Sequence, residues 1–229
     1  MMKTNQISES IELGILMAIS GGIMDAYSYL FRGQVFANAQ TGNILLFGVS
    51  LSEGNFSQAM QYACPILAFS IGIMLADFAR IRLKKMLHWR QYAVFMEAII
   101  LLFVGFIPTR YNLLANSLTS LACGIQVESF RKIHGKGMAT TMCIGNLRSA
   151  TQNMCDFLDT RKKSALHASL LYYGIIVCFT LGAVLGSKCM PYLQVKTIWL
   201  SVFFLGMGFF LMFMDQSAVS AYRDLHKKR

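Results

Sequence analysis

Two short polar stretches hold most of the residues of this sequence that could bind a small solute. The segments VFANAQTGNILLFG (35–48) and TTMCIGNL (140–147) interrupt apolar sequence with Asn, Gln, Thr and Gly. Amide and hydroxyl side chains donate and accept hydrogen bonds, which suits a small neutral polar or weakly anionic solute. The candidate substrate-binding residues are Asn38, Gln40, Thr41, Gly42, Asn43, Gln126, Thr140, Thr141, Gly145 and Asn146.

Three acidic residues lie inside apolar sequence, where a carboxylate is costly unless it is paired or hydrated. Asp25 and Glu128 fall deep in two hydrophobic stretches, and Glu97 lies about six residues into another. A carboxyl that responds to the filling of a cavity could couple transport to a proton or cation. The alternative is an internal anchor, with Asp25 bonded to nearby amides and Glu128 paired with a neighbouring arginine.

The sequence offers no catalytic or metal-binding pattern. The four histidines lie in predicted loops or at the ends of apolar stretches, and none has the spacing of a metal site. A membrane-embedded enzyme would need a nucleophile with a base or a metal set inside the bundle. We therefore expect no enzyme activity and no cofactor.

Composition predicts an integral membrane protein. Of 229 residues, 55% are hydrophobic and 14% charged, and the mean hydropathy is +0.49; a soluble domain carries about 25% charged residues. The net charge of +10 is explained by basic cytoplasmic loops, so the expected partner is the lipid bilayer and not nucleic acid. A homo-oligomer is compatible with this composition.

Six apolar stretches are long enough to cross a hydrocarbon core of about 30 Å as helices. They cover residues 11–31, 59–80, 91–108, 112–130, 167–187 and 194–214. Two shorter segments remain, 35–52 and 137–155. If both dip into the membrane and return, 17 of the 21 basic residues face the cytoplasm. If both cross, the two sides carry nearly equal numbers. The positive-inside rule thus predicts six spans, two re-entrant segments and both termini cytoplasmic.

The two halves of the chain resemble each other. An offset of 103 residues places Gly21 on Gly124 and Asp25 on Glu128, and an offset of 110 places FSIGIMLAD (69–77) on FTLGAVLGS (179–187). Three spans in each half require opposite orientations, as in many transporters. The predicted fold is all-α, with an inverted repeat of residues 1–110 and 111–229 in one transmembrane domain.

Each polar segment is expected to end in a half-helix that starts near the midplane. We expect Gly42 to turn the chain and Asn43 to cap a helix from residue 44 to about 52. In the second half, the corresponding helix should run from residue 147 to about 155. Non-helical backbone at this depth is tolerated where it is buried in protein or faces water. The alternative is that both asparagines are caps that only stabilise packing.

At these residues the chain resembles the YoaK-type family of bacterial membrane proteins, a domain of unknown function. The resemblance is carried by GGIMDAYSYL, VFANAQTGNILLFG, CGIQVESF and TTMCIGNL, and covers about residues 11–214. It implies a polytopic protein of the bacterial plasma (inner) membrane and identifies no substrate. The repeats differ in that Ile144 stands where the first has Thr41.

The leading hypothesis is a small-solute transporter with its site at the interface of the two repeats. A second is a channel-like pore, because opposed half-helices capped by Asn resemble the architecture of aquaporins. A third is a structural or regulatory membrane protein, since duplication alone does not establish flux.

Overall fold

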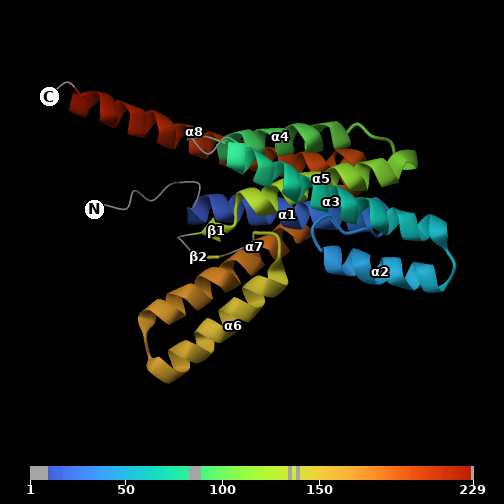
Figure 1. The fold of residues 1–229 in the computed structure, drawn as a ribbon, viewed down its shortest axis with the longest axis horizontal. Helices are drawn as coiled ribbons and strands as arrows, with labels where there is room; N and C mark the ends of the chain where they lie inside the picture. The colour runs from blue at the N-terminus through green and yellow to red at the C-terminus, as the bar shows by residue number, and fades with distance from the viewer. Residues whose placement is uncertain (1–9, 83–88, 134–135, 138–139, 228–229) are drawn as a thin grey trace.

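The computed structural model describes residues 10–82, 89–133, 136–137 and 140–227, most of which are helical (Figure 1). The α-helices are α1 (Ile11–Phe31), α2 (Gln40–Ser52), α3 (Phe56–Arg82), α4 (Trp89–Val104), α5 (Asn112–Ser129), α6 (Cys143–Thr160), α7 (Lys163–Leu193) and α8 (Trp199–Lys227). Short 3₁₀ helices, η2 (Thr109–Tyr111) and η3 (Gln194–Ile198), and a small hairpin, β1 (Lys132–Ile133) with β2 (Lys136–Gly137), complete the described chain. The prediction of a helical protein is confirmed.

Some predicted features fall on residues that the structure does not describe. These are residues 138 and 139 of the second polar segment, and five of the basic residues used to predict topology. Those five are Lys3, Lys84, Lys85, Lys228 and Arg229.

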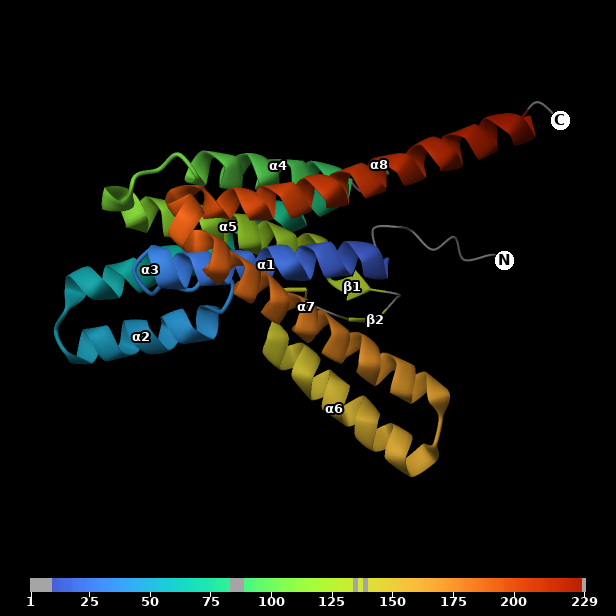
Figure 2. The ribbon, with the colours of Figure 1, turned by 180° about the vertical axis from the view of Figure 1, so that it is seen from behind.

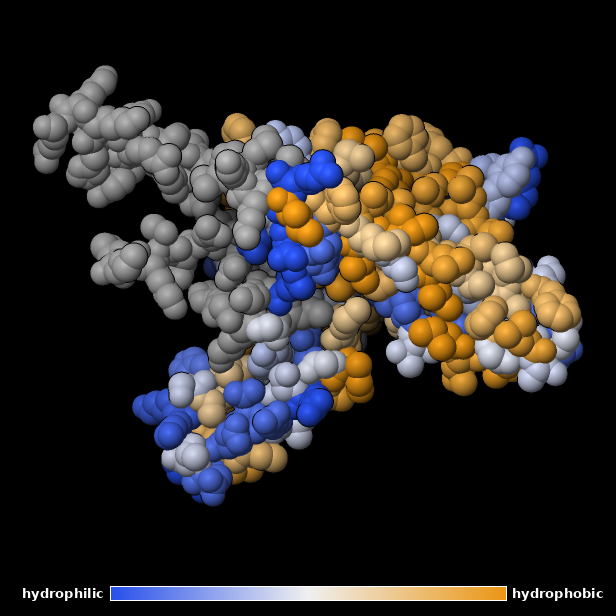
Figure 3. Space-filling model, in the orientation of Figure 1, coloured by the Kyte–Doolittle hydropathy of each residue, from blue (hydrophilic) through white to orange (hydrophobic). Residues whose placement is uncertain are grey.

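A helix lies in each of the six predicted apolar ranges. By length and hydropathy, α1, α3 and the continuous stretch Lys163–Met214, which includes α7 and part of α8, could cross a membrane. Large apolar side chains are exposed on α3 and α4, and they form the orange surface over these helices in Figure 3. An apolar exterior of this kind fits a lipid environment. The structure therefore agrees with a membrane protein.

The chain reverses direction after α1 without a full-length return helix. Gly33 and Gln34 adopt positive φ angles of 91° and 61°, and the following loop runs back along α1 to the start of α2 (Figures 1 and 2). α2 then packs against α3, and in the second half α6 packs against α7. The α6–α7 pair extends away from the bundle at an angle, as both views show.

Glycines allow α1 and α7 to approach until their backbones touch. A Cβ added at Gly22 would overlap the carbonyl oxygen of Phe179, and one added at Gly182 would overlap the carbonyl oxygen of Ile19. Small residues at such points let membrane helices pack closely. The interface is therefore set by backbone contact and tolerates no side chain at these two positions.

The same type of contact joins α3 and α5. A Cβ at Gly124 would overlap the carbonyl oxygen of Phe69, and one at Gly72 would overlap the carbonyl oxygen of Leu121. Gly72 and Gly182 thus each lie where two helices touch backbone to backbone.

The glycine contacts bear on the register of the predicted alignment. If Phe69 is matched with Phe179 by the offset of 110 residues, the contacts match Gly124 with Gly22 and not with Gly21. In that register Asp25 and Glu128 are one residue apart, which turns a helical side chain by about 100°; the equivalence of the two acids stays a prediction.

Arg32 fastens one end of the bundle. Its side chain is 1% exposed, and its guanidinium donates to the Tyr27 hydroxyl at 2.7 Å and to the carbonyl oxygen of Ile107 at 2.7 Å. It also donates to Asn112 Oδ1 at 3.2 Å, while the Tyr27 hydroxyl donates to the carbonyl oxygen of Val195. One buried side chain thus ties the end of α1 to the α4–α5 connection and, through Tyr27, to η3.

The glycine contacts predict the effect of adding one methyl group. Gly182→Ala should lower the melting temperature in detergent, because overpacking against a backbone costs about 1–3 kcal/mol. Gly174→Ala is the matched control, since it lies on α7 and a Cβ there meets nothing within 4 Å; alanine also favours helix over glycine. Equal melting temperatures for the two variants would contradict the backbone contact.

Candidate functional site

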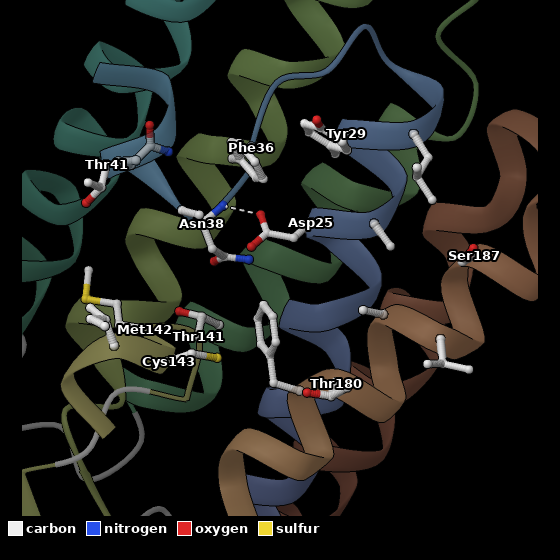
Figure 4. Close-up of a pocket in the computed structure, with 18 of the residues that line it drawn as sticks. Asp25, Tyr29, Phe36, Asn38, Thr41, Thr141, Met142, Cys143, Thr180 and Ser187 are labelled. Carbon is white, nitrogen blue, oxygen red and sulfur yellow. Dashed lines mark hydrogen bonds between the residues drawn. The ribbon is translucent and has the colours of Figure 1, made fainter. Parts of the chain in front are cut away.

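A cavity of 870 Å³ lies among α1, α7 and the first residues of α2 and α6 (Figure 4). Asp25 and Tyr29 line it from α1, and Thr41, Thr141 and Cys143 line it from the two shorter helices and the segment before α6. The remaining wall is formed largely by α7, from Phe179 to Lys188. The beginnings of two helices that are far apart in sequence therefore open into one space.

Asp25 holds the loop before α2. Its Oδ1 accepts a hydrogen bond of 2.7 Å from the backbone amide of Asn38, and the amides of Ala37 and Ala39 also interact with this carboxyl group. Ala39 is the N-cap of α2 and makes no side-chain cap bond. The carboxyl group of α1 thus lies where anions are favoured, at a helix N-terminus. This agrees with the predicted internal anchor, and Asp25 also reaches the cavity.

Asn43 braces the same loop, and its position differs from the prediction. Its side chain accepts from the amide of Phe36 at 2.9 Å and donates to the carbonyl oxygen of Phe36 at 2.8 Å and to Gln40 Oε1 at 2.8 Å. Because α2 already begins at Gln40, Asn43 is not its N-cap. Gly42 likewise lies within α2, where its missing Cβ leaves room for the Phe36 ring.

α6 also begins and ends elsewhere than predicted. It starts at Cys143, four residues before the expected start at residue 147, and continues to Thr160. Its N-cap is Met142, which makes no side-chain cap bond among the described residues. Asn146 is buried within the first turns, and Gly145 faces open space.

Four of the ten predicted binding residues line the cavity: Asn38, Gln40, Thr41 and Thr141. The other six lie outside its lining. They are Gly42, Asn43, Gln126, Thr140, Gly145 and Asn146.

Gln126 and Thr140 have structural contacts instead. Gln126 Nε2 donates to the carbonyl oxygen of Met17 at 3.2 Å and to Thr140 Oγ1 at 3.4 Å. These bonds join α5 to α1 and to the segment before α6.

The three acids occupy different environments. Asp25 lines the cavity, whereas Glu97 is fully buried in α4 away from it. Glu128 pairs with Arg131 at 2.9 Å and approaches Arg80 Nε at 3.9 Å. The pairing of Glu128 with Arg131 is the anchoring alternative that the sequence offered.

Aromatic and polar residues of the cavity wall were not predicted. They are Tyr29, Phe36, Phe179, Thr180, Ser187 and Lys188. Thr180 and Ser187 are seven residues apart and therefore share one face of a helix, a polar pattern that could have been found in an apolar span. The aromatic residues gave no comparable signal. Among the described residues, no group of three His, Cys, Asp or Glu side chains could hold a metal ion.

Comparison with known proteins identifies the family of this chain. The model of the family of proteins of unknown function DUF1275 matches residues 13–211. The chain belongs to this family. It is 23% identical over 198 residues to the UPF0700 transmembrane protein YoaK of Bacillus subtilis strain 168, an alignment that covers 82% of this chain and 87% of YoaK. No solved structure matches. Membership of the family, with the apolar helices, supports a transmembrane protein.

The bonds of Asn43 predict the effect of its removal. Asn43→Ala should increase hydrogen exchange at residues 36–42 and lower the melting temperature, since the buried groups left unpaired cost about 1–3 kcal/mol. Thr41→Ala, on the exposed side of the same turn, is the matched control. If amide hydrogen exchange at residues 36–42 is the same in both variants as in the parent protein, Asn43 does not hold the loop.

Proposed function

We propose that this protein is a small-solute transporter whose binding site is the cavity beside Asp25. The observation that carries the proposal is that the starts of α2 and α6 line one cavity together with a carboxylate. In secondary transporters, substrate sites lie where interrupted helices meet, with half-helix N-termini directed at the substrate.

The packing of the helices supports an inverted repeat. The contact between α1 and α7 corresponds to the contact between α5 and α3. The contact between α6 and α7 corresponds to that between α2 and α3. The contact between α1 and α8 corresponds to that between α5 and α4. This is the set of contacts expected if α1 to α4 and α5 to α8 are equivalent units. The matching glycine contacts of Gly22 and Gly124 support the same relation.

The path of the chain supports a re-entrant first segment. The 13 residues of α2 rise about 20 Å, less than the hydrocarbon core of about 30 Å. The loop before it returns along α1, and α2 and α3 then form a hairpin (Figure 2). In the proposed arrangement, α2 and α6 each start near the midplane and lead back to the side from which their segment entered.

Contacts beside the cavity support a transporter over an open pore. A Cβ on Gly21 would lie 2.5 Å from Thr141 Cγ2 and 3.4 Å from the Phe179 ring, so α1, α7 and the segment before α6 are in contact there. In this proposal that contact closes one side of the cavity, as alternating access requires of each state. In this proposal Asp25 is the coupling carboxyl, Glu128 braces the end of α5, and Glu97 is a buried acid with no direct access to the solute.

The topology can be tested with single cysteines in a background without the six native ones. In the six-span arrangement, Glu53→Cys and Arg110→Cys react with a membrane-impermeant maleimide from outside the cell. Lys162→Cys reacts only after the cytoplasmic side is opened. Reaction of residue 53 from the cytoplasm would show that α2 crosses the membrane, and reaction of residue 162 from outside would show that α6 does.

The cavity and its function can be tested in proteoliposomes. Thr41→Cys should react with a soluble maleimide, because this residue lines the cavity, and the reaction should block solute counterflow. Leu45→Cys is the control on the same helix, since its side chain is 66% exposed on the outer surface and would face lipid. If no solute from a broad set of amino acids, sugars and organic acids shows counterflow, the transporter proposal fails.

A further inference from the structure

The cavity has two buried polar atoms that lack a protein partner. Asn38 Oδ1 and Thr141 Oγ1 make no hydrogen bond, although their residues are only 2% and 3% exposed. Buried polar groups in proteins are nearly always satisfied. Both residues line the cavity, and Figure 4 shows them around the same space as Asp25. They mark the positions where a ligand would supply the missing bonds.

The first of these positions accepts hydrogen bonds. The orientation of the Asn38 amide is fixed because its Nδ2 donates to the carbonyl oxygen of Gly21 at 3.1 Å, and Oδ1 is therefore the free atom. Asp25 lies beside it and is also an acceptor when ionised. An amide oxygen and a carboxylate together suit a ligand group with several donors and a positive charge, as an ammonium group has.

The second position offers donors. The Thr141 hydroxyl can donate, and Thr141 immediately precedes Met142, the N-cap residue of α6, which makes no side-chain cap bond. The first amides of a helix carry partial positive charge and bind carboxylates and other anions. The two ends of the site thus have opposite electrostatic character.

The rest of the wall is mainly apolar. Phe36, Phe179 and Val184 lie along it, and the acid Asp25 is matched by one base, Lys188, on the exposed part of the lining. One acid and one base favour a ligand with no net charge over a singly charged one. An apolar body on the ligand would remain in contact with the rings and branched side chains.

We propose that the cavity binds a zwitterion with an apolar side chain, of the α-amino acid class. Its ammonium group lies between Asp25 and Asn38 Oδ1, its carboxylate faces Thr141 and the first amides of α6, and its side chain lies against Phe36 and Phe179. This inference rests on the proposed function and names the substrate class of the same site.

The test compares three probes that share one aromatic body. L-Phenylalanine, 2-phenylethylamine and 3-phenylpropionate are titrated into the purified protein in lipid nanodiscs by calorimetry. The zwitterion should bind at least about tenfold more tightly than either singly charged probe, since each of those probes lacks one of the two charged groups that would form hydrogen bonds in the site.

Two variants separate the ends of the site. Thr141→Val should weaken phenylalanine several-fold while leaving 2-phenylethylamine unchanged, because only the carboxylate loses a donor. Asp25→Asn should reduce the affinity for both amines. Thr151→Val is the matched control on α6, where Thr151 is exposed and donates to the carbonyl oxygen of Leu147. If Asp25→Asn unfolds the loop before α2, Thr141→Val still tests the proposed position of the ligand carboxylate.

Each outcome decides a different question. If 2-phenylethylamine binds as tightly as phenylalanine, the proposed site for the ligand carboxylate at Thr141 and the start of α6 is wrong. If none of the three probes binds while another solute shows counterflow, the substrate class is wrong and the transporter function stands. If no solute binds or exchanges, the failure lies in the proposed function itself.

Discussion

The structure depends on satisfying the backbone of one broken segment, residues 32–39, within an otherwise apolar helical bundle. Unpaired amides and carbonyl groups are costly in lipid, which is why spanning segments are normally continuous helices. Here three side chains make hydrogen bonds to backbone groups that a continuous helix would otherwise pair. Asn116 of α5 binds the carbonyl oxygen of Arg32, Asp25 binds the amide of Asn38, and Asn43 binds both backbone groups of Phe36. The start of α2 is fixed by these bonds, and the cavity exists because α2 starts there.

The helices could be predicted from sequence because hydropathy over about 20 residues reports directly on burial in lipid. The predicted range 11–31 coincides with α1. The starts of α2 and α6 could not be located in the same way. Gly42 and Asn43 suggested a turn and a cap, but Asn43 bonds backwards to Phe36 from inside the helix, and the actual turn is made by Gly33 and Gln34.

The candidate site was partly predictable for a similar reason. Asn38, Gln40, Thr41 and Thr141 attract notice as polar residues at breaks in apolar sequence. Phe36 and Phe179 do not, because the chain has 17 phenylalanines and nothing in sequence separates those of a cavity wall from those that face lipid. The equivalence of Asp25 and Glu128 stays a prediction; the contacts between backbones match Gly124 with Gly22, which differs by one residue from the alignment made from side-chain types.

The glycine contacts also divide the molecule into stiff and compliant parts. Helices that touch backbone to backbone, α1 with α7 and α3 with α5, cannot slide past each other without steric overlap. Between these pairs, α1 meets α5 over a short contact that includes the sulfur atoms of Met24 and Cys123, 3.6 Å apart. Thioether and thiol side chains adapt readily to altered packing. Any large movement is therefore expected as a rocking of one rigid pair against the other about this sulfur contact, with α6 carried by the first pair and α2 by the second.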